Sequence, residues 1–213
     1  MDDVPASIER CLSAVEAIRS PALRAHEDIV GSLSAVLGTL VGLDGGQTSL
    51  LRYAACLHDI GKIAMPDAII NKPAPLDAAE WAIVRQHTTL GHSVLEGSAD
   101  AAVRLAATVA LWHHESWDGS GYPHGLAGAA IPREARIVGV CDVYHALREV
   151  RPYKQALEHD QALRIILEGD AEGRTRPTQF DPRLLAALKR HDDAIREHYE
   201  AARTEAFKRF PIG

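Results

Sequence analysis

The chain has 213 residues, a formal net charge of −6 and 46% hydrophobic residues. This length supports one domain with a real core, and the negative charge argues against a broad DNA-binding surface. No stretch approaches the roughly 20 apolar residues of a membrane span, and the acidic start, Met1 to Asp3, does not have the pattern of a signal segment. Cys11, Cys56 and Cys141 lie among apolar residues without metal-type spacing, which predicts free thiols and a cytoplasmic protein.

Apolar residues recur at three- and four-residue steps along nearly the whole chain, which predicts an all-α fold with a long C-terminal helix. Residues 1–20 are expected to form a helical lead-in, and residues 21–213 a single compact domain. A stripe that includes His87 predicts one continuous helix over 77–94. The other expected helices are 21–40, 49–57, 100–114, one that begins at 132, 160–169 and 181–209.

Start signals support several of these helices. Asp77 with Glu80 is typical of a capping box, and Asp181 followed by Pro182 is a cap followed by a proline in the first turn. Asp160 is expected to cap the helix that ends at Gly169. The stretches 65–76, 115–131 and 169–180 are expected to be irregular, and the four glycines of the second indicate a shaped surface loop.

Histidines and aspartates are spread over several of the predicted helices, two of them as adjacent doublets. A lone histidine is usually a packed core residue, but doublets that close apolar runs are costly to bury without partners. Imidazole and carboxylate ligands together suit Fe, Mn, Ni or Zn. The predicted metal ligands are His26, His58, Asp59, His87, His113, His114 and Asp142.

Asp59 is the candidate bridging ligand. A bridging carboxylate can hold two cations about 3.5–4 Å apart, and such a pair lowers the pKa of a shared water so that it attacks phosphate esters near neutral pH. The sequence therefore predicts a two-metal hydrolytic site.

Two runs carry a family resemblance. The run His58-Asp59-Ile60-Gly61-Lys62 resembles the signature of the HD superfamily of metal phosphohydrolases. The run from His113 to Pro123, HHESWDGSGYP, resembles that of the HD-GYP subfamily. The resemblance covers about residues 26–188. It implies a helical phosphodiesterase that hydrolyses cyclic di-GMP to pGpG and, in some members, to GMP.

The resemblance also implies roles for single residues. One metal would be bound by His26, His58, Asp59 and Asp142, and the other by Asp59, His87, His113 and His114. Besides Asp59, Lys62 is the other candidate catalytic residue, and it would meet a substrate phosphate or the bridging water. Tyr122, Arg151 and Lys154 would contact substrate. Iron or manganese is the expected native metal, with zinc or nickel as ions acquired in purification.

Three positions depart from the family pattern. Ala22 stands where some members have a third-metal glutamate, so two metals are predicted rather than three. Ile29 replaces an arginine. His145 replaces the second aspartate of a D-x-x-D-A run, and a structural role is expected for it.

Other functions stay open at this point. The chain could be a cyclic di-GMP receptor with little turnover, a phosphohydrolase of another cyclic dinucleotide, or an interaction module. In the last case the Gly119–Pro123 loop would contact a diguanylate cyclase domain. Apolar positions after Pro182 could serve a homodimer, although packing within the chain is preferred. About 25 residues precede His26, too few for a regulatory domain, so either the protein stands alone or the chain is an excised part.

Overall fold

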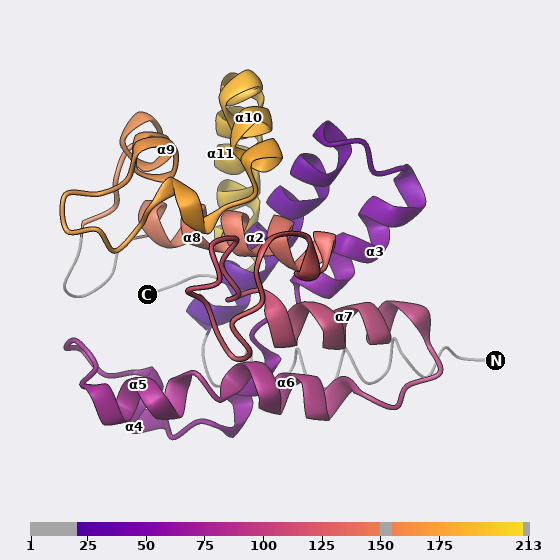
Figure 1. Cartoon of the computed structure of the whole chain (residues 1–213), viewed down its shortest axis with the longest axis vertical. Helices are drawn as coiled ribbons and strands as arrows, with labels where there is room; N and C mark the ends of the chain where they lie inside the picture. The colour runs from indigo at the N-terminus through magenta and orange to yellow at the C-terminus, as the bar shows by residue number, and fades with distance from the viewer. Residues whose placement is uncertain (1–20, 150–154, 211–213) are drawn as a thin grey trace.

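The computed structural model describes residues 21–149 and 155–210, and over these residues the fold is all-α (Figure 1). The α-helices are α2 (Pro21–Leu40), α3 (Gly45–Ala55), α4 (Asp67–Ile70), α5 (Ala78–Val84), α6 (His87–Leu95), α7 (Ala101–Trp112), α8 (Arg133–Arg148), α9 (His159–Glu168), α10 (Pro182–Arg190) and α11 (Asp192–Arg209). Three short 3-10 helices are η1 (Ile60–Ala64), η2 (Gly128–Ala130) and η3 (Pro177–Gln179). The all-α prediction is confirmed, and the α4, η2 and η3 turns lie in stretches that were expected to be irregular.

The helix starts follow from side-chain caps, and two predicted starts were wrong. The Asp77 and Glu80 capping box is present as expected. However, α3 begins at Gly45 rather than Ser49, because the carboxylate of Asp44 accepts the Gln47 amide at 2.8 Å in a second capping box. Likewise α9 is capped by Glu158, and Asp160 lies inside its first turn.

The predicted single helix over 77–94 is instead two helices, α5 and α6, separated at Arg85 and Gln86. Side-chain donors bind the carbonyl groups at this junction. Nδ1 of His87 lies 2.7 Å from the carbonyl oxygen of Val84, and the Thr88 hydroxyl donates to the Arg85 carbonyl at 3.0 Å. Such local bonds compete with the regular helical ladder, so the chain turns before His87.

The predicted final helix from Asp181 to Arg209 is also interrupted. Asp181 caps α10, as expected, but the chain leaves helical geometry at His191 and starts again as α11. Leu184, Leu188 and Ile195 are buried in the chain's own core. This confirms intramolecular packing of these residues, which leaves them unavailable to a homodimer.

The core forms around α2, which packs against α3, α8 and α11, while α7 packs against α3 and α6 (Figure 1). Ile29 is one of the fully buried core side chains. Cys56 and Cys141 are free thiols, as predicted, and Cys11 lies outside the described residues. Over the described ranges, no helix is long and apolar enough to cross a bilayer.

Gly61 allows a close approach between η1 and α6. A Cβ atom at this position would lie 2.0 Å from the His87 carbonyl oxygen and 2.6 Å from the Gly91 amide nitrogen, far inside van der Waals contact. The absence of a side chain therefore lets the His58-Asp59 turn lie directly against the start of α6. The same contact brings His87 to Asp59.

Candidate metal centre

The seven predicted ligands come from five separate parts of the fold, most of them at helix ends. His58 and Asp59 lie in the turn between α3 and η1, His87 is the first residue of α6, and His113 and His114 directly follow α7. His26 lies on α2 and Asp142 on α8. Helix ends leave the backbone free to turn side chains inward, and here the structure brings all of these side chains toward Asp59 or His26.

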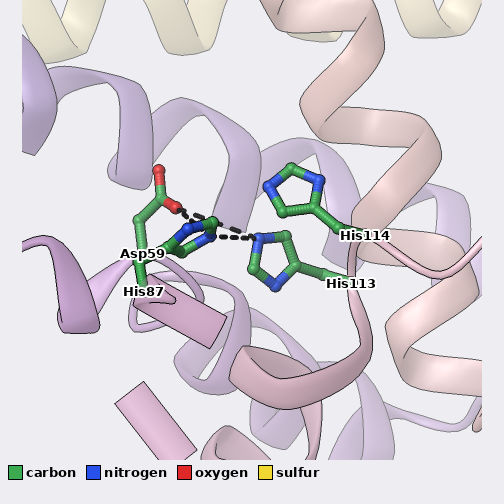
Figure 2. Close-up of side chains that lie close together, drawn as sticks. All are labelled: Asp59, His87, His113 and His114. Atoms are coloured by element: carbon green, nitrogen blue, oxygen red, sulfur yellow. Dashed lines mark hydrogen bonds and ion pairs between the residues drawn. The ribbon is translucent and has the colours of Figure 1, made fainter. Parts of the chain in front are cut away.

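The first compact group surrounds one oxygen of the Asp59 carboxylate. Oδ1 lies 3.2 Å from Nε2 of His87 and 3.9 Å from Nε2 of His113. Asp59, His87, His113 and His114 each offer a ligand atom, and the four atoms all lie within 4.8 Å of one another. Figure 2 shows these side chains pointing toward a common centre.

The second group surrounds the other oxygen of the same carboxylate. Oδ2 of Asp59 lies 3.5 Å from Nε2 of His58 and 3.7 Å from Nε2 of His26. His26, His58 and Asp59 again have ligand atoms within 4.8 Å of one another. Asp142 lies at the edge of this group, with Oδ1 3.4 Å from Nε2 of His26. Asp59 therefore faces one histidine set with each oxygen, which is the geometry of a bridging carboxylate.

Hydrogen bonds assign the hydrogen of three of these imidazoles to Nδ1. Nδ1 of His58 lies 2.7 Å from the Ala55 carbonyl oxygen, Nδ1 of His87 lies 2.7 Å from that of Val84, and Nδ1 of His113 lies 3.0 Å from that of Ala110. A carbonyl oxygen can only accept, so Nδ1 must donate. In a neutral ring this leaves Nε2 as a lone pair, the form that binds metal ions.

The spacing of the Nε2 atoms also fits bound cations. Nε2 of His87 and Nε2 of His113 are 3.3 Å apart, and Nε2 of His26 and Nε2 of His58 are 3.2 Å apart. Two nitrogens that each lie about 2 Å from one ion in tetrahedral geometry are separated by about 3.3 Å. Oδ1 of Asp59 is buried and has no hydrogen-bond partner among the described residues. The donor set, the spacing and this orphaned oxygen all fit a pair of divalent metal ions.

The electrostatics keep the ligands in their metal-binding forms. Burial lowers the pKa of His87 to about 4, and burial first, then neighbouring histidines, holds the pKa values of His26, His113 and His114 well below their usual range. Burial alone would raise the pKa of Asp59, but Lys62 and the surrounding histidines hold it well below its usual range. At neutral pH these four imidazoles are therefore neutral, and the Asp59 carboxyl group is ionised.

Two predicted non-ligand residues lie beside these groups. The Lys62 ammonium contacts Oδ2 of Asp59 directly. The Tyr122 ring stacks on the His114 ring, with centres 4.8 Å apart and planes inclined by 27°. Arg151 and Lys154 lie outside the described residues.

A buried carboxylate inside the 115–131 loop closes the loop on itself. Glu115 accepts the backbone amides of His124 at 2.7 Å and Leu126 at 2.9 Å. Gly121 packs so tightly that a Cβ there would lie 2.3 Å from the Ser116 amide nitrogen. The loop is therefore shaped, as expected, and it holds Tyr122 against the histidines.

A pocket of about 280 Å³ opens beside the first group. His113, His114 and Tyr122 form one wall, and Arg85, Arg136 and Arg174 also line it. Sequence reasoning missed these arginines. Arg85 lies with its guanidinium carbon 4.9 Å from the centre of the Tyr122 ring. Its place two residues before His87 was the only available signal, and it does not distinguish Arg85 from an ordinary surface residue.

His145 also lies next to the centre. Its ring centre is 4.9 Å from that of His26, and His26, His145 and Glu149 form a third group with ligand atoms within 4.8 Å. The predicted count of two metals stays a prediction.

Comparison with known proteins places this chain among HD proteins. A family model described as HD domain matches residues 10–184. The Cyclic di-GMP phosphodiesterase response regulator RpfG of Xanthomonas campestris pv. campestris is 39% identical over 184 residues, which cover 86% of this chain and 47% of that protein. The 3'3'-cGAMP-specific phosphodiesterase 2 of Vibrio cholerae is 39% identical over 181 residues, 85% of this chain and 33% of that protein. The chain thus spans about half, or less, of the length of these relatives.

A solved structure has the same fold. The HD domain of the L. monocytogenes phosphodiesterase PgpH, in complex with cyclic-di-AMP, superposes with a TM-score of 0.60 at 17% identity. The match covers 95% of this chain and 98% of that chain. At this identity the likeness establishes the fold alone, and it agrees with the all-α architecture described above.

Proposed function

This chain belongs to the HD domain family, and we propose that it is a metal-dependent phosphodiesterase that hydrolyses cyclic di-GMP to pGpG, with GMP as a further product. The membership expected from His58-Asp59 and the 113–123 run is confirmed by the family match and the relatives. The observation that carries the proposal is the position of Asp59, whose two carboxylate oxygens each face a separate pair of histidine Nε2 atoms.

Two divalent cations, iron or manganese, would supply an activated water and neutralise charge on the phosphate. His26, His58, Asp59 and Asp142 would hold one ion, and Asp59 with the other three histidines the second. The water oxygen bonds to phosphorus, the bond from phosphorus to the 3' oxygen breaks, and that oxygen leaves with a proton. The product is a linear dinucleotide with a 5' phosphate.

Other residues of the chain would bind and orient the substrate. Lys62 places a positive charge at the edge of the centre, within reach of a phosphate or of the attacking water. Tyr122 presents its ring to the pocket wall beside His114. Arg151 and Lys154 would contact phosphates, as the family resemblance implies.

A second candidate substrate is 3'3'-cGAMP. The relative named as specific for that dinucleotide has the same identity to this chain, 39%, as the relative named for cyclic di-GMP. The two substrates differ in one purine, so the phosphate chemistry at Asp59 is the same for both. The preferred substrate is therefore identified by comparing the rates at which the protein hydrolyses the two dinucleotides.

The test is an anaerobic incubation of iron- or manganese-loaded protein with cyclic di-GMP, 3'3'-cGAMP and cyclic di-AMP, with products resolved over time. A His58→Ala, Asp59→Ala double variant removes the centre. His92→Ala is the matched control, because His92 is partly exposed and pairs with Glu96 at the C-terminal cap of α6. Cleavage by wild type and by the control, but not by the double variant, supports the proposal. Binding without turnover would instead favour the receptor function.

A further inference from the structure

The buried surroundings of His145 connect the metal centre to α11. His145 lies on α8 one turn after Asp142 and is only 3% exposed. Nδ1 of His145 lies 2.9 Å from the hydroxyl oxygen of Tyr199, a fully buried residue of α11 that is 54 positions away along the chain. Nε2 lies on the opposite side of the ring, 3.9 Å from a carboxylate oxygen of Glu149.

These neighbours hold the His145 ring at two edges. Nδ1 shares a buried hydrogen bond with the Tyr199 hydroxyl, and the Glu149 carboxylate lies on the Nε2 side. Tyr199 is itself held in place, because the Arg148 guanidinium carbon lies 4.9 Å from its ring centre and Arg148 pairs with Glu200 on α11. The His145 ring is therefore fixed from both sides.

His26 differs from the ligands whose second nitrogen is anchored on a carbonyl group. His58, His87 and His113 each bind a backbone carbonyl through Nδ1. In the described part of the chain, the polar contacts of the His26 side chain run through Nε2, which lies 3.2 Å from Nε2 of His58 and 3.4 Å from Oδ1 of Asp142. The His145 ring packs against it, with centres 4.9 Å apart and planes inclined by 40°. The packing against His145 thus restrains the orientation of the His26 ring, as the bonds to backbone carbonyl groups restrain the rings of His58, His87 and His113.

We propose that Tyr199 and His145 form a positioning pair that fixes the orientation of His26 and thereby sets the metal affinity of the group formed by His26, His58 and Asp59. The two residues act on the metal through His26 and are not ligands. The inference rests on the metal centre of the proposed function but not on its substrate.

Tyr199→Phe is the direct test, because it deletes only the hydroxyl that holds His145. Tyr144→Phe is a matched control in the same aromatic cluster. Tyr144 lies edge-on to Tyr199 with ring centres 5.2 Å apart, but its hydroxyl binds Nδ1 of His159 at 2.7 Å and accepts from Arg148 at 3.4 Å, and it makes no bond to His145 or His26 among the described residues. Both variants lose one buried hydroxyl, so an effect of general destabilisation would be common to the two.

The measurement is a titration of the metal-free protein with Co²⁺ alone. Calorimetry and the visible spectrum of the bound ion both report the binding. His26→Ala identifies which binding step belongs to the His26 group. Tyr199→Phe should weaken that step about tenfold and leave the other unchanged, since partners behind metal ligands are typically worth 10- to 100-fold in affinity. Tyr144→Phe should change neither step.

His145→Gln is the second variant and keeps the proposal testable if Tyr199→Phe does not fold. It removes the ring that packs on His26 and should weaken the same step. Equal Co²⁺ affinities for Tyr199→Phe and Tyr144→Phe would overturn the positioning pair. Loss of one whole ion per chain in His145→Gln would also overturn it, because His145 would then be a ligand. Wild type that binds both ions but cleaves no cyclic dinucleotide would refute the proposed substrate and leave this inference standing.

Discussion

The Nε2 atoms of His87 and His113 lie 3.3 Å apart, and in each ring the hydrogen is on the opposite nitrogen, where it faces a backbone carbonyl. Two nitrogen lone pairs at this distance repel each other unless a cation lies between them. Both rings are buried, so these nitrogens cannot be solvated without a cost in free energy. A divalent cation bound between the two nitrogens would replace this repulsion with two metal–nitrogen bonds.

Replacing Asp59, the proposed bridging carboxylate, should remove metal and activity together. Asp59→Asn keeps the shape of the side chain but loses the negative charge that faces both histidine sets. We expect fewer bound ions per chain and hydrolysis reduced by more than about 100-fold, since even the partners behind metal ligands are worth about 10- to 100-fold. Metal analysis of the purified protein and a timed product assay measure the two effects.

Asp160→Asn, at an exposed position on α9, is the control for this change and should behave as wild type. Full metal content in Asp59→Asn would show that Asp59 is not a bridging ligand.

Acid should destabilise the metal-free protein between about pH 6.5 and about pH 4. The ordinary histidine pKa is about 6.5, and burial lowers that of His87 to about 4, with His26, His113 and His114 shifted in the same direction. In this window the unfolded chain binds more protons than the folded chain, so the free energy of unfolding falls as the pH falls. Above about pH 6.5 these histidines are neutral in both the folded and the unfolded chain, so they no longer lower the free energy of unfolding.

Urea unfolding with a chelator, at several pH values across this window, measures the effect. Asp59 adds a separate loss of stability at lower pH. Its pKa in the folded protein is held below the usual range, so the stabilisation by its ionised form is lost as the pH falls through that lowered pKa. A free energy of unfolding that stays constant from about pH 7.5 to about pH 4.5 would contradict the buried neutral histidines.

The ring of Tyr122 should matter more than its hydroxyl for the metal group that contains His114. The Tyr122 and His114 rings stack with centres 4.8 Å apart, and the Arg85 guanidinium lies over the face of the Tyr122 ring. Tyr122→Phe keeps both contacts and should bind metal like wild type. Tyr122→Ala removes the support of His114 and should weaken metal binding about tenfold. Isothermal titration of the two variants with Mn²⁺ separates these roles, and equal affinities would rule out support by the ring.

The clustering of the candidate metal-binding residues could be predicted from the sequence mainly because two adjacent doublets mark the site. The doublets His58-Asp59 and His113-His114 each close an apolar run, and that is visible without a structure. The break before His87 could not be predicted, because it depends on side-chain bonds to carbonyl groups that compete with the helical ladder. The stripe of apolar residues continues across the break, so periodicity alone predicts one helix.

Long-range contacts set the other limit. Tyr199 reaches His145 only because α11 packs against α2 beside α8, and no local pattern marks Tyr199 as the partner of His145. Glu158 rather than Asp160 caps α9 because Glu158 forms the reciprocal bond with Gln161, although aspartate is the commoner cap.

Gly61→Ala should disrupt the fold and the metal centre together. The added methyl group would lie 2.0 Å from the His87 carbonyl oxygen, and backbone on both sides leaves it no room to move. Overpacking typically costs about 1–3 kcal/mol, and relief of the clash would move η1 away from α6 and separate Asp59 from His87. We therefore expect a lower free energy of unfolding and weaker metal binding. Gly45→Ala is the matched control, since a Cβ there meets no atom within 4 Å. Chemical denaturation and Mn²⁺ titration of both variants check this, and a Gly61→Ala protein with wild-type metal affinity would show that the close approach does not position Asp59.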